Sequence, residues 1–386
     1  MKYVWVKNNM DNDLFEAGLV FGVILLLIGI SVAPSITAIS YNSLVQTKPH
    51  SFNKVESLIS KYQPFFQRQF CDVPYNGFNV EDIDFKDACY NGNNTKFWRP
   101  FEWWYFDAIF DNNYSVEFHI NLANIKGIGV IVSMLNIYKD GELLVHNEEF
   151  LLPKEFIASK DEPLITLSSQ QIMTGYVDKS GNFIFNVSLQ MEDCAVDLRF
   201  ASVTQGWKSK ILNMWWWSVI QPNACVDGTI RVHNETIPVK GTGYQEHVWD
   251  GTMPVVWGWF WGKFVSENMS VIWADIFKNP RSQYVMMVLN HNNGGYINIP
   301  YEKIQFSFTN FTFNNGWWIP TSFHFKVEDK SIQIDIKADA VNIVHQTSFI
   351  SFNYWRYHVH AKGAISFDST TENIDNMQIM DLTRFY

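Results

Sequence analysis

From Trp98 to the C-terminus the chain is a succession of short segments in which apolar and polar residues alternate. In "SVEFHINLA", residues 115–123, and "SIQIDIKADA", residues 331–340, every second side chain is apolar. A period of two predicts strands with one buried and one solvated face. Turn sequences such as "KDGE", "DKSGN" and "NHNNGG" separate the segments. We therefore predict an all-β body with closed or nearly closed sheets, preceded by a short helix near 53–67.

The N-terminal region departs from this pattern with an uncharged apolar segment from Ala17 to Ser40. A helix of that length crosses about 30 Å of hydrocarbon, so the segment is expected to be a transmembrane anchor. Small residues near Ala38 also permit cleavage as a signal peptide, and secretion is the alternative. Residues 1–40 are accordingly predicted to contact the membrane, and residues 41–96 to form an exported linker.

Two kinds of residue beyond the apolar segment favour an extracellular location. The N-x-S/T sequons begin at Asn93, Asn113, Asn186, Asn234, Asn268 and Asn310. The cysteines are Cys71, Cys89, Cys194 and Cys225. Export permits both glycosylation and disulfide formation. We predict the pairs Cys71–Cys89 and Cys194–Cys225, with free buried thiols as the alternative.

Composition narrows the class of partner. The net charge of −10 excludes nucleic acid, which requires a basic surface to neutralise phosphates. With 16 Trp, 16 Tyr and 31 Phe, the chain has aromatic side chains enough to line a pocket as well as a core. An apolar small molecule is the expected partner. No cofactor is expected, and no metal, because His358 and His360 have the spacing of two ligands but lack a third nearby.

A weak internal repeat divides the β-body. The segment "WYFDAIFDNNYSV", from Trp104, aligns without gaps with "WFWGKFVSENMSV", from Trp259. Each copy is an aromatic strand, a turn with a sequon and a new strand. The repeat predicts two related β-units, 97–230 and 231–386, with a border near 225–240.

Four motifs carry a resemblance to a known family. They are "PFEWWYFDA" (100–108), "GTGYQEHVWDG" (241–251), "WGWFWGKF" (257–264) and "WADI" (273–276). Their order resembles that of the carotenoid 1,2-hydratase family, which includes AttH-like proteins. The resemblance covers 97–386 and implies two tandem lipocalin-like (calycin) β-barrel halves.

The resemblance also implies the site residues. An H-x-W pair and a Y-x-D pair are linked to activity in the hydratases of this family, and these roles fall on His247, Trp249, Trp273 and Asp275. Trp273 stands in place of the usual tyrosine, and "GYQEHVWDG" in place of "GYHDHNWG". Substrate contacts are expected from Tyr244, Glu246, Trp104, Trp257 and Trp259.

The chemistry expected of Asp275 follows from its place in the repeat. Asp275 aligns with Ile120 on the apolar face of the first copy, so it should point inward. Burial of a carboxylate raises its pKa above about 3.9. A neutral buried acid can protonate an alkene, and each nearby Trp stabilises the carbocation by about 1–2 kcal/mol. His247, on the same strand face as Trp249, is expected to orient Asp275 or to accept the second proton.

Three functions from different classes are compatible with these features. The first is a hydratase (hydro-lyase) or isomerase that acts on an isoprenoid or other apolar substrate at the outer membrane face. The second is a lipid-binding or lipid-carrying lipocalin-like protein without chemistry. The third is a cell-surface glycan-binding protein. An inward-facing Asp275 favours the first function, and an Asp275 held at a turn favours the second.

Overall fold

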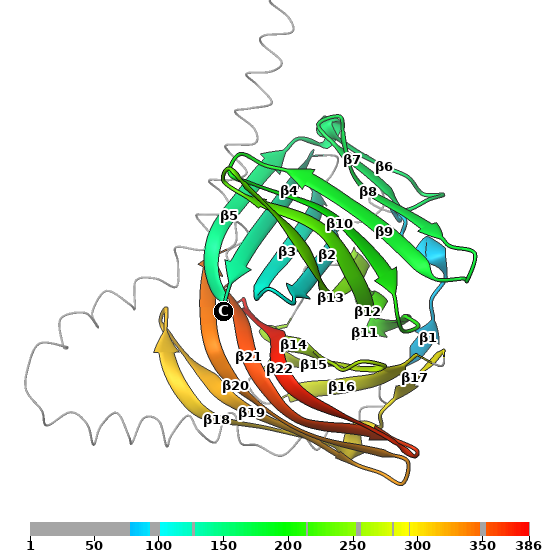
Figure 1. The fold of residues 1–386 in the computed structure, drawn as a ribbon, viewed down its shortest axis with the longest axis vertical. Helices are drawn as coiled ribbons and strands as arrows, with labels where there is room; N and C mark the ends of the chain where they lie inside the picture. Colours follow the sequence, from blue (N-terminus) through cyan, green and yellow to red (C-terminus); the bar gives the residue numbers. More distant parts are fainter. Residues whose placement is uncertain are drawn as a thin grey trace, which may run out of the picture.

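The computed structural model describes residues 78–92, 101–125, 128–213, 215–251, 256–279, 282–292, 294–347 and 353–385. In these ranges the chain consists of strands and short 3-10 helices, which confirms the all-β prediction (Figure 1). The predicted apolar span, the helix near 53–67, Cys71 and Asn93 lie outside the described residues. Among the residues that are described, no helix is long and apolar enough to cross a membrane.

The first sheet is antiparallel, has 13 strands and curls into a nearly closed barrel. Its main path is β5 (Glu142–Leu151), β4 (Ile128–Lys139), β3 (Tyr114–Ile125), β2 (Phe101–Phe110), β13 (Glu235–Gly251), β12 (Trp215–Val232), β10 (Cys194–Ser202), β9 (Phe183–Gln190), β8 (Gln170–Val177), β7 (Leu164–Leu167) and β6 (Phe156–Ala158). Beside β12 lie β11 (Trp207–Ile211) and β1 (Val80–Asp82).

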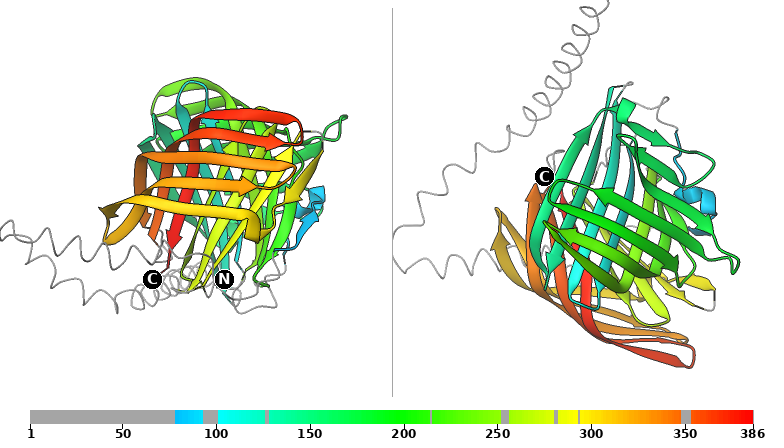
Figure 2. Two further views of the ribbon diagram at one scale, coloured as in Figure 1. Left: turned by 90° about the horizontal axis from the view of Figure 1, so that it is seen from below. Right: turned by 45° about the horizontal axis from the view of Figure 1, so that its top comes forward.

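The second sheet has nine strands and forms a half-barrel beside the first (Figure 2). Its order is β17 (Gly295–Asn298), β16 (Ser282–His291), β15 (Met269–Asn279), β14 (Gly258–Val265), β22 (Thr370–Arg384), β21 (Asn353–Phe367), β20 (Ile332–Thr347), β19 (Trp317–Glu328) and β18 (Ile304–Asn314). Short 3-10 helices, η2 (Phe85–Ala88), η4 (Pro153–Glu155) and η5 (Tyr301–Lys303), accompany the strands.

Alternation along the strands sorts side chains into three buried regions. Phe106 and Phe118 belong to the core inside the first sheet, and Phe260 and Trp273 to the core inside the second. A third cluster, with Tyr105 among its members, packs the outer face of the first sheet against the second. Strands that line this junction are buried on both faces, which accounts for densely aromatic segments such as "WGWFWGKF".

The border between the two units lies later than the sequence predicts. Strands β12 and β13 form one long hairpin, and both belong to the first sheet. The first sheet therefore extends to Gly251 and the second begins at Gly258. The predicted division into 97–230 and 231–386, with a border near 225–240, is wrong because it would cut this hairpin.

The repeat is correct as a pair of hairpins but wrong by one residue in its first strand. In the second strand of each hairpin the alignment is correct: Val271 and Trp273 of β15 point inward, as do their counterparts Val116 and Phe118 of β3. In β14, however, the inward residue is Phe260, and its neighbour Trp259 packs against the apolar cluster between the two sheets. The ungapped alignment pairs Trp259 with the inward-facing Trp104 and so places it on the wrong face.

The predicted Cys194–Cys225 disulfide is contradicted by the strand register. Cys194 lies opposite Val232, whereas Cys225 lies opposite Ala201 on the same pair of strands. The two Cα atoms are therefore roughly 20 Å apart along the strands, far beyond the roughly 7 Å that a disulfide bridges. Cys194 and Cys89 are buried free thiols, and Cys225 is an exposed one.

We expect thiol reagents to distinguish these cysteines. Cys225 should react with a maleimide in the native protein because it is exposed. Cys89 and Cys194 should react only after denaturation, since burial raises the pKa of both thiols, that of Cys89 to about 11. Peptide mass spectrometry after native labelling measures this, and protection of Cys225 would contradict the arrangement.

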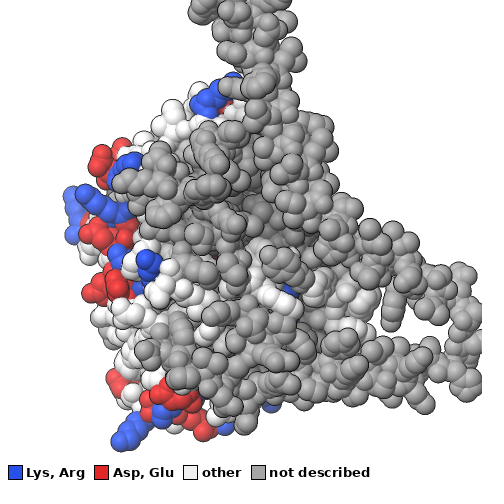
Figure 3. Space-filling view, turned by 180° about the vertical axis from the view of Figure 1, so that it is seen from behind, with Lys and Arg blue, Asp and Glu red and all other residues white. Residues whose placement is uncertain are grey.

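The described surface carries most of the predicted sequons. Asn113, Asn186, Asn234 and Asn310 are exposed. Asn268 is engaged instead, because its Nδ2 donates to Oε1 of Glu372 at 2.8 Å. On the face shown in Figure 3, acidic and basic side chains of the described residues are intermixed rather than gathered by sign.

Candidate functional site

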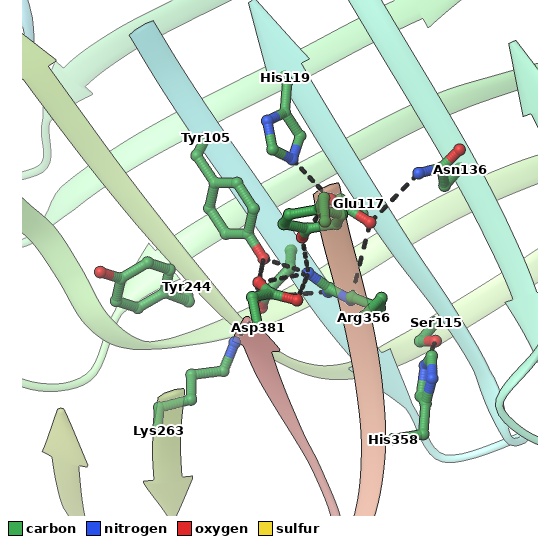
Figure 4. Close-up of polar contacts among 12 residues, drawn as sticks. Tyr105, Ser115, Glu117, His119, Asn136, Tyr244, Lys263, Arg356, His358 and Asp381 are labelled. Atoms are coloured by element: carbon green, nitrogen blue, oxygen red, sulfur yellow. Dashed lines mark hydrogen bonds and ion pairs between the residues drawn. The ribbon is translucent and has the colours of Figure 1, made fainter. Parts of the chain in front are cut away.

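Buried charged side chains form a cluster where the outer faces of the two sheets meet (Figure 4). At its centre is Arg356 of β21, which is fully buried. Its Nη1 donates hydrogen bonds to Oδ2 of Asp381, at 3.1 Å, and to the hydroxyl of Tyr105. The guanidinium also lies 3.7 Å from Oε2 of Glu117 and 3.6 Å from Oδ2 of Asp107. One cation of the second sheet is thus surrounded by carboxyl groups from both sheets.

Further polar groups extend this junction cluster of charges. Lys263 of β14 donates a hydrogen bond to Oδ1 of Asp107 on β2. Glu117 interacts with polar side chains from both sheets, namely Asn136, Tyr138, His119 and Tyr354. Nearby, Oγ of Ser115 and Nε2 of His358 lie 2.8 Å apart and connect β3 to β21.

The electrostatics of the cluster favour a neutral Asp381. Burial raises the pKa of Asp381, although the charge of Arg356 opposes this rise. Glu117 is buried too, but there Arg356 and the contacts with His119 prevail and hold the pKa below its usual range. The cluster therefore links the two sheets through Arg356 and the carboxyl groups around it.

His247 and Trp249 lie inside the first sheet, on the inner face of β13. The His247 ring is stacked on Trp104 at 4.6 Å and lies 4.9 Å from the nearer ring of Trp249. Its Nδ1 is 2.6 Å from the carbonyl oxygen of Asp87, which only accepts, so this nitrogen donates. Its Nε2 is 3.0 Å from Oε1 of Glu102. Both ring nitrogens are thus engaged, and His247 fixes η2 against the end of the barrel.

Tyr244 and Glu246 point to the opposite face of β13, into the junction between the sheets. Oε2 of Glu246 accepts hydrogen bonds from Nε1 of Trp217, at 2.5 Å, and from the Tyr244 hydroxyl, at 2.7 Å. Nε1 of Trp103 donates to Oε1 at 3.1 Å. Burial raises the pKa of Glu246, although these hydrogen bonds lower it. Three donors therefore fix the carboxyl group of Glu246, which stabilises the junction between the sheets.

The two remaining predicted contact residues, Trp257 and Trp259, lie outside the interior of the second sheet. The Trp259 ring is 6.4 Å from that of Trp215 and 5.2 Å from that of Phe385. Trp257 is 39% exposed. Neither side chain belongs to the core inside the second sheet, where Asp275 lies.

Asp275 lies on the inner face of β15 and is 1% exposed, which confirms that it points inward. It is opposite Phe260 in the strand pairing and two residues from Trp273. Among the described residues, its Oδ1 has no hydrogen-bond partner. Burial raises its pKa to about 8, although the charge of Arg384 opposes the rise. The carboxyl group is therefore largely neutral at pH 7 and can donate a proton.

The four residues linked to activity by resemblance are divided between two interiors. His247 and Trp249 belong to the inside of the first sheet, and Trp273 and Asp275 to the inside of the second. The apolar cluster between the two sheets separates these interiors. The prediction that His247 orients Asp275 or accepts its proton is therefore wrong. Alternation along a strand predicts which side chains point inward. It does not predict which of the two sheets encloses them.

Comparison with known proteins supports the fold. No family model matches the chain, and neither does any curated protein. A solved structure of a protein assigned as AttH from Nitrosomonas europaea has a TM-score of 0.57 and 12% identity, over 79% of this chain and 98% of the other. Structures of CghA, with Sch210972 and without it, have TM-scores of 0.48 and 0.43, at 8% and 7% identity, each over 80% of this chain and 98% of the other. The AttH likeness is one of fold: two barrel-like sheets, consistent with tandem lipocalin-like halves.

Sequence reasoning missed the charged junction cluster and the polar residues near Asp275. A signal was present, since "YWRYH" and "MDLTRF" each place charges within an apolar strand. Charged residues are rarely buried unless they are paired.

In the part of the chain that is described, no three His, Cys, Asp or Glu side chains are grouped so as to hold a metal ion.

Proposed function

We propose that the protein is a lipocalin-like enzyme that hydrates or isomerises an alkene in an isoprenoid or other apolar molecule, with Asp275 as the proton donor. The observation that carries this proposal is the state of Asp275: buried in an aromatic interior, with an unpaired carboxyl oxygen and a raised pKa. Structural acids are normally hydrogen-bonded when buried. Burial that keeps an acid neutral is also what general acid catalysis requires.

The reaction needs only this carboxyl group and water. Asp275 transfers its proton to one alkene carbon, the π-electron pair forms the new C–H bond, and the other carbon becomes cationic. The aromatic faces of Trp273 and Phe260 lie beside Asp275 and stabilise this cation. In hydration, water adds to the cation and its surplus proton returns to the carboxylate. In isomerisation, a carbon next to the cation gives a proton to the Asp275 carboxylate instead, and the electron pair of that C–H bond forms the double bond in its new position.

A deuterium experiment tests this function. The purified protein is incubated in D2O with lipid extract and with defined isoprenoids, and the products are analysed by mass spectrometry. An acid-catalysed hydratase or isomerase leaves a non-exchangeable deuterium on carbon, because the proton of Asp275 exchanges with solvent between turnovers. Recovery of every ligand unlabelled would contradict catalysis.

A carrier without chemistry is the second candidate. The separation of His247 from Asp275 favours it, since the histidine predicted to assist proton transfer is engaged in the other sheet. A carrier would yield co-purified lipid that is unaltered in the deuterium experiment. Displacement of that lipid by other apolar molecules would then be its measurable activity.

We expect turnover to fall as the pH rises past about 8. The pKa of Asp275 is raised to about 8, so the donor is protonated below that pH and ionised above it. The pH dependence of kcat, measured with a substrate found in the deuterium experiment, checks this. A kcat that rises through the same range would exclude Asp275 as the acid.

We also propose that the β-domain lies outside the cell, attached through the apolar segment from Ala17 to Ser40. The support is the length of that segment and the sequons beyond it. Protease added to intact cells should remove the β-domain, and protection of the domain would refute the proposal. Recovery of the domain from the medium would instead indicate a cleaved segment.

A further inference from the structure

Three polar atoms on the inner face of the second sheet lack a hydrogen-bond partner among the described residues. They are Nε1 of Trp273, Oδ1 of Asp275 and the hydroxyl oxygen of Tyr357. All three side chains are at most 1% exposed. Buried polar groups are almost always paired, so three unpaired ones in one apolar interior indicate a missing partner.

These three groups face a common region around Phe260. Trp273 and Asp275 are alternate residues of β15, and Phe260 lies directly opposite Asp275 on β14. The ring of Phe260 is 6.4 Å from that of Trp273 and 5.6 Å from that of Tyr357. Side chains from three different strands, β14, β15 and β21, thus converge in one place.

Arg384 adds a positive charge to the same region. Arg384 lies two residues after the inward-facing Leu382 of β22, so it is on the same face of the strand. Its Cζ lies 4.6 Å from the ring centroid of Phe277. Its charge acts on both Asp275 and Tyr357. Burial lowers the pKa of Arg384 to about 10, so it stays charged at neutral pH.

We propose that this region binds the carboxylate end of an otherwise apolar molecule. Arg384 supplies the charge, while Nε1 of Trp273 and the hydroxyl of Tyr357 donate hydrogen bonds to the carboxylate oxygens. The inference rests on the proposed function in placing the ligand inside the second sheet. It narrows the substrate class from any isoprenoid to long unsaturated carboxylic acids. The reacting double bond would then lie near the carboxylate, within reach of Asp275.

A pair of probes that differ only in charge tests this inference. A fluorescent polyene fatty acid and its methyl ester are titrated against the full-length protein, and energy transfer from tryptophan reports binding. The acid should bind at least tenfold more tightly than the ester. Tyr357→Phe should weaken acid binding about tenfold, as expected for the loss of one hydrogen bond to a charged group, and leave ester binding unchanged.

Controls separate recognition from folding. Tyr176→Phe removes the hydroxyl of an exposed tyrosine on the first sheet and should change neither affinity. The urea midpoint of Tyr357→Phe should not decrease, because the variant removes a buried hydroxyl that makes no protein hydrogen bond. Equal affinity for acid and ester, no acid binding by the wild-type protein, or equal losses for both probes in Tyr357→Phe would each overturn the inference.

The inference and the proposed function can fail separately. Acid binding that depends on Tyr357, without deuterium on the ligand, would support the inference and count against catalysis. Deuterium incorporation without any preference for the acid over the ester would do the reverse.

Discussion

Replacing Asp275 with asparagine is expected to reduce turnover by about 10²- to 10⁴-fold, the usual contribution of a general acid. Asparagine keeps the shape and the neutrality of the protonated aspartate but has no acidic proton. Affinity for apolar ligands should therefore stay within about twofold of wild type. On the scale of about 1.4 kcal/mol for each factor of ten, that is less than about 0.5 kcal/mol of binding free energy. Single-turnover deuterium incorporation and tryptophan fluorescence measure the two quantities separately.

Two variants serve as controls for this experiment. Asp335→Asn changes an exposed carboxylate on the same sheet and should leave turnover unchanged. His247→Gln should also leave the chemical step intact, because His247 lies in the other sheet. Full activity in Asp275→Asn would remove Asp275 from the mechanism and favour the carrier function.

The pH dependence of stability offers an independent check on the same carboxyl group. In the native state the pKa of Asp275 is about 8, against about 3.9 in the unfolded chain. Between these values the native state holds a proton that the unfolded state releases. This group therefore makes the protein less stable as the pH rises from about 4 to about 8. The decrease should be smaller in Asp275→Asn, as measured by urea denaturation across that range, and the part that remains comes from other buried acids such as Asp381.

Alternation along the chain was sufficient to predict the fold class, and alignment of the second strand of the repeat was sufficient to predict that Asp275 points inward. Each depends on local spacing, because a period of two fixes which side chains share a face. The predicted border near 225–240 falls at the turn between β12 and β13. These two long strands form one hairpin of the first sheet, and the sequence does not show that a turn joins strands of the same sheet. The predicted contact between His247 and Asp275 was wrong because both side chains point inward, but each lies inside a different sheet.

The junction between the sheets was beyond sequence reasoning for another physical reason. Arg356 and Asp107 are far apart in the chain, and each is polar on a strand whose other face is apolar, as a solvated face would be. Only the packing of one sheet against the other turns that face into an interior. An outward polar residue and a buried ion-pair partner look alike until the second surface is known.

Arg356→Met is expected to give the largest loss of stability among the variants considered, about 3–5 kcal/mol. Methionine has a similar length but no charge, so Glu117 and Asp107 would stay buried without the cation that lies 3.7 and 3.6 Å from them. Asp107 keeps its contact with Lys263. Most of the loss therefore comes from the buried carboxylate of Glu117, which is left without its cation, and not from the attraction itself. Urea denaturation followed by tryptophan fluorescence measures it.

A matched control shows whether burial causes this effect. Arg199→Met breaks an ion pair with Asp227 at 3.8 Å, in which both side chains are largely exposed. Exposed pairs contribute about 0–1 kcal/mol because water and salt screen them, so this variant should unfold nearly as wild type does. If Arg356→Met lost no more stability than Arg199→Met, the junction cluster would not hold the two sheets together. The packing of the apolar junction residues would then be sufficient.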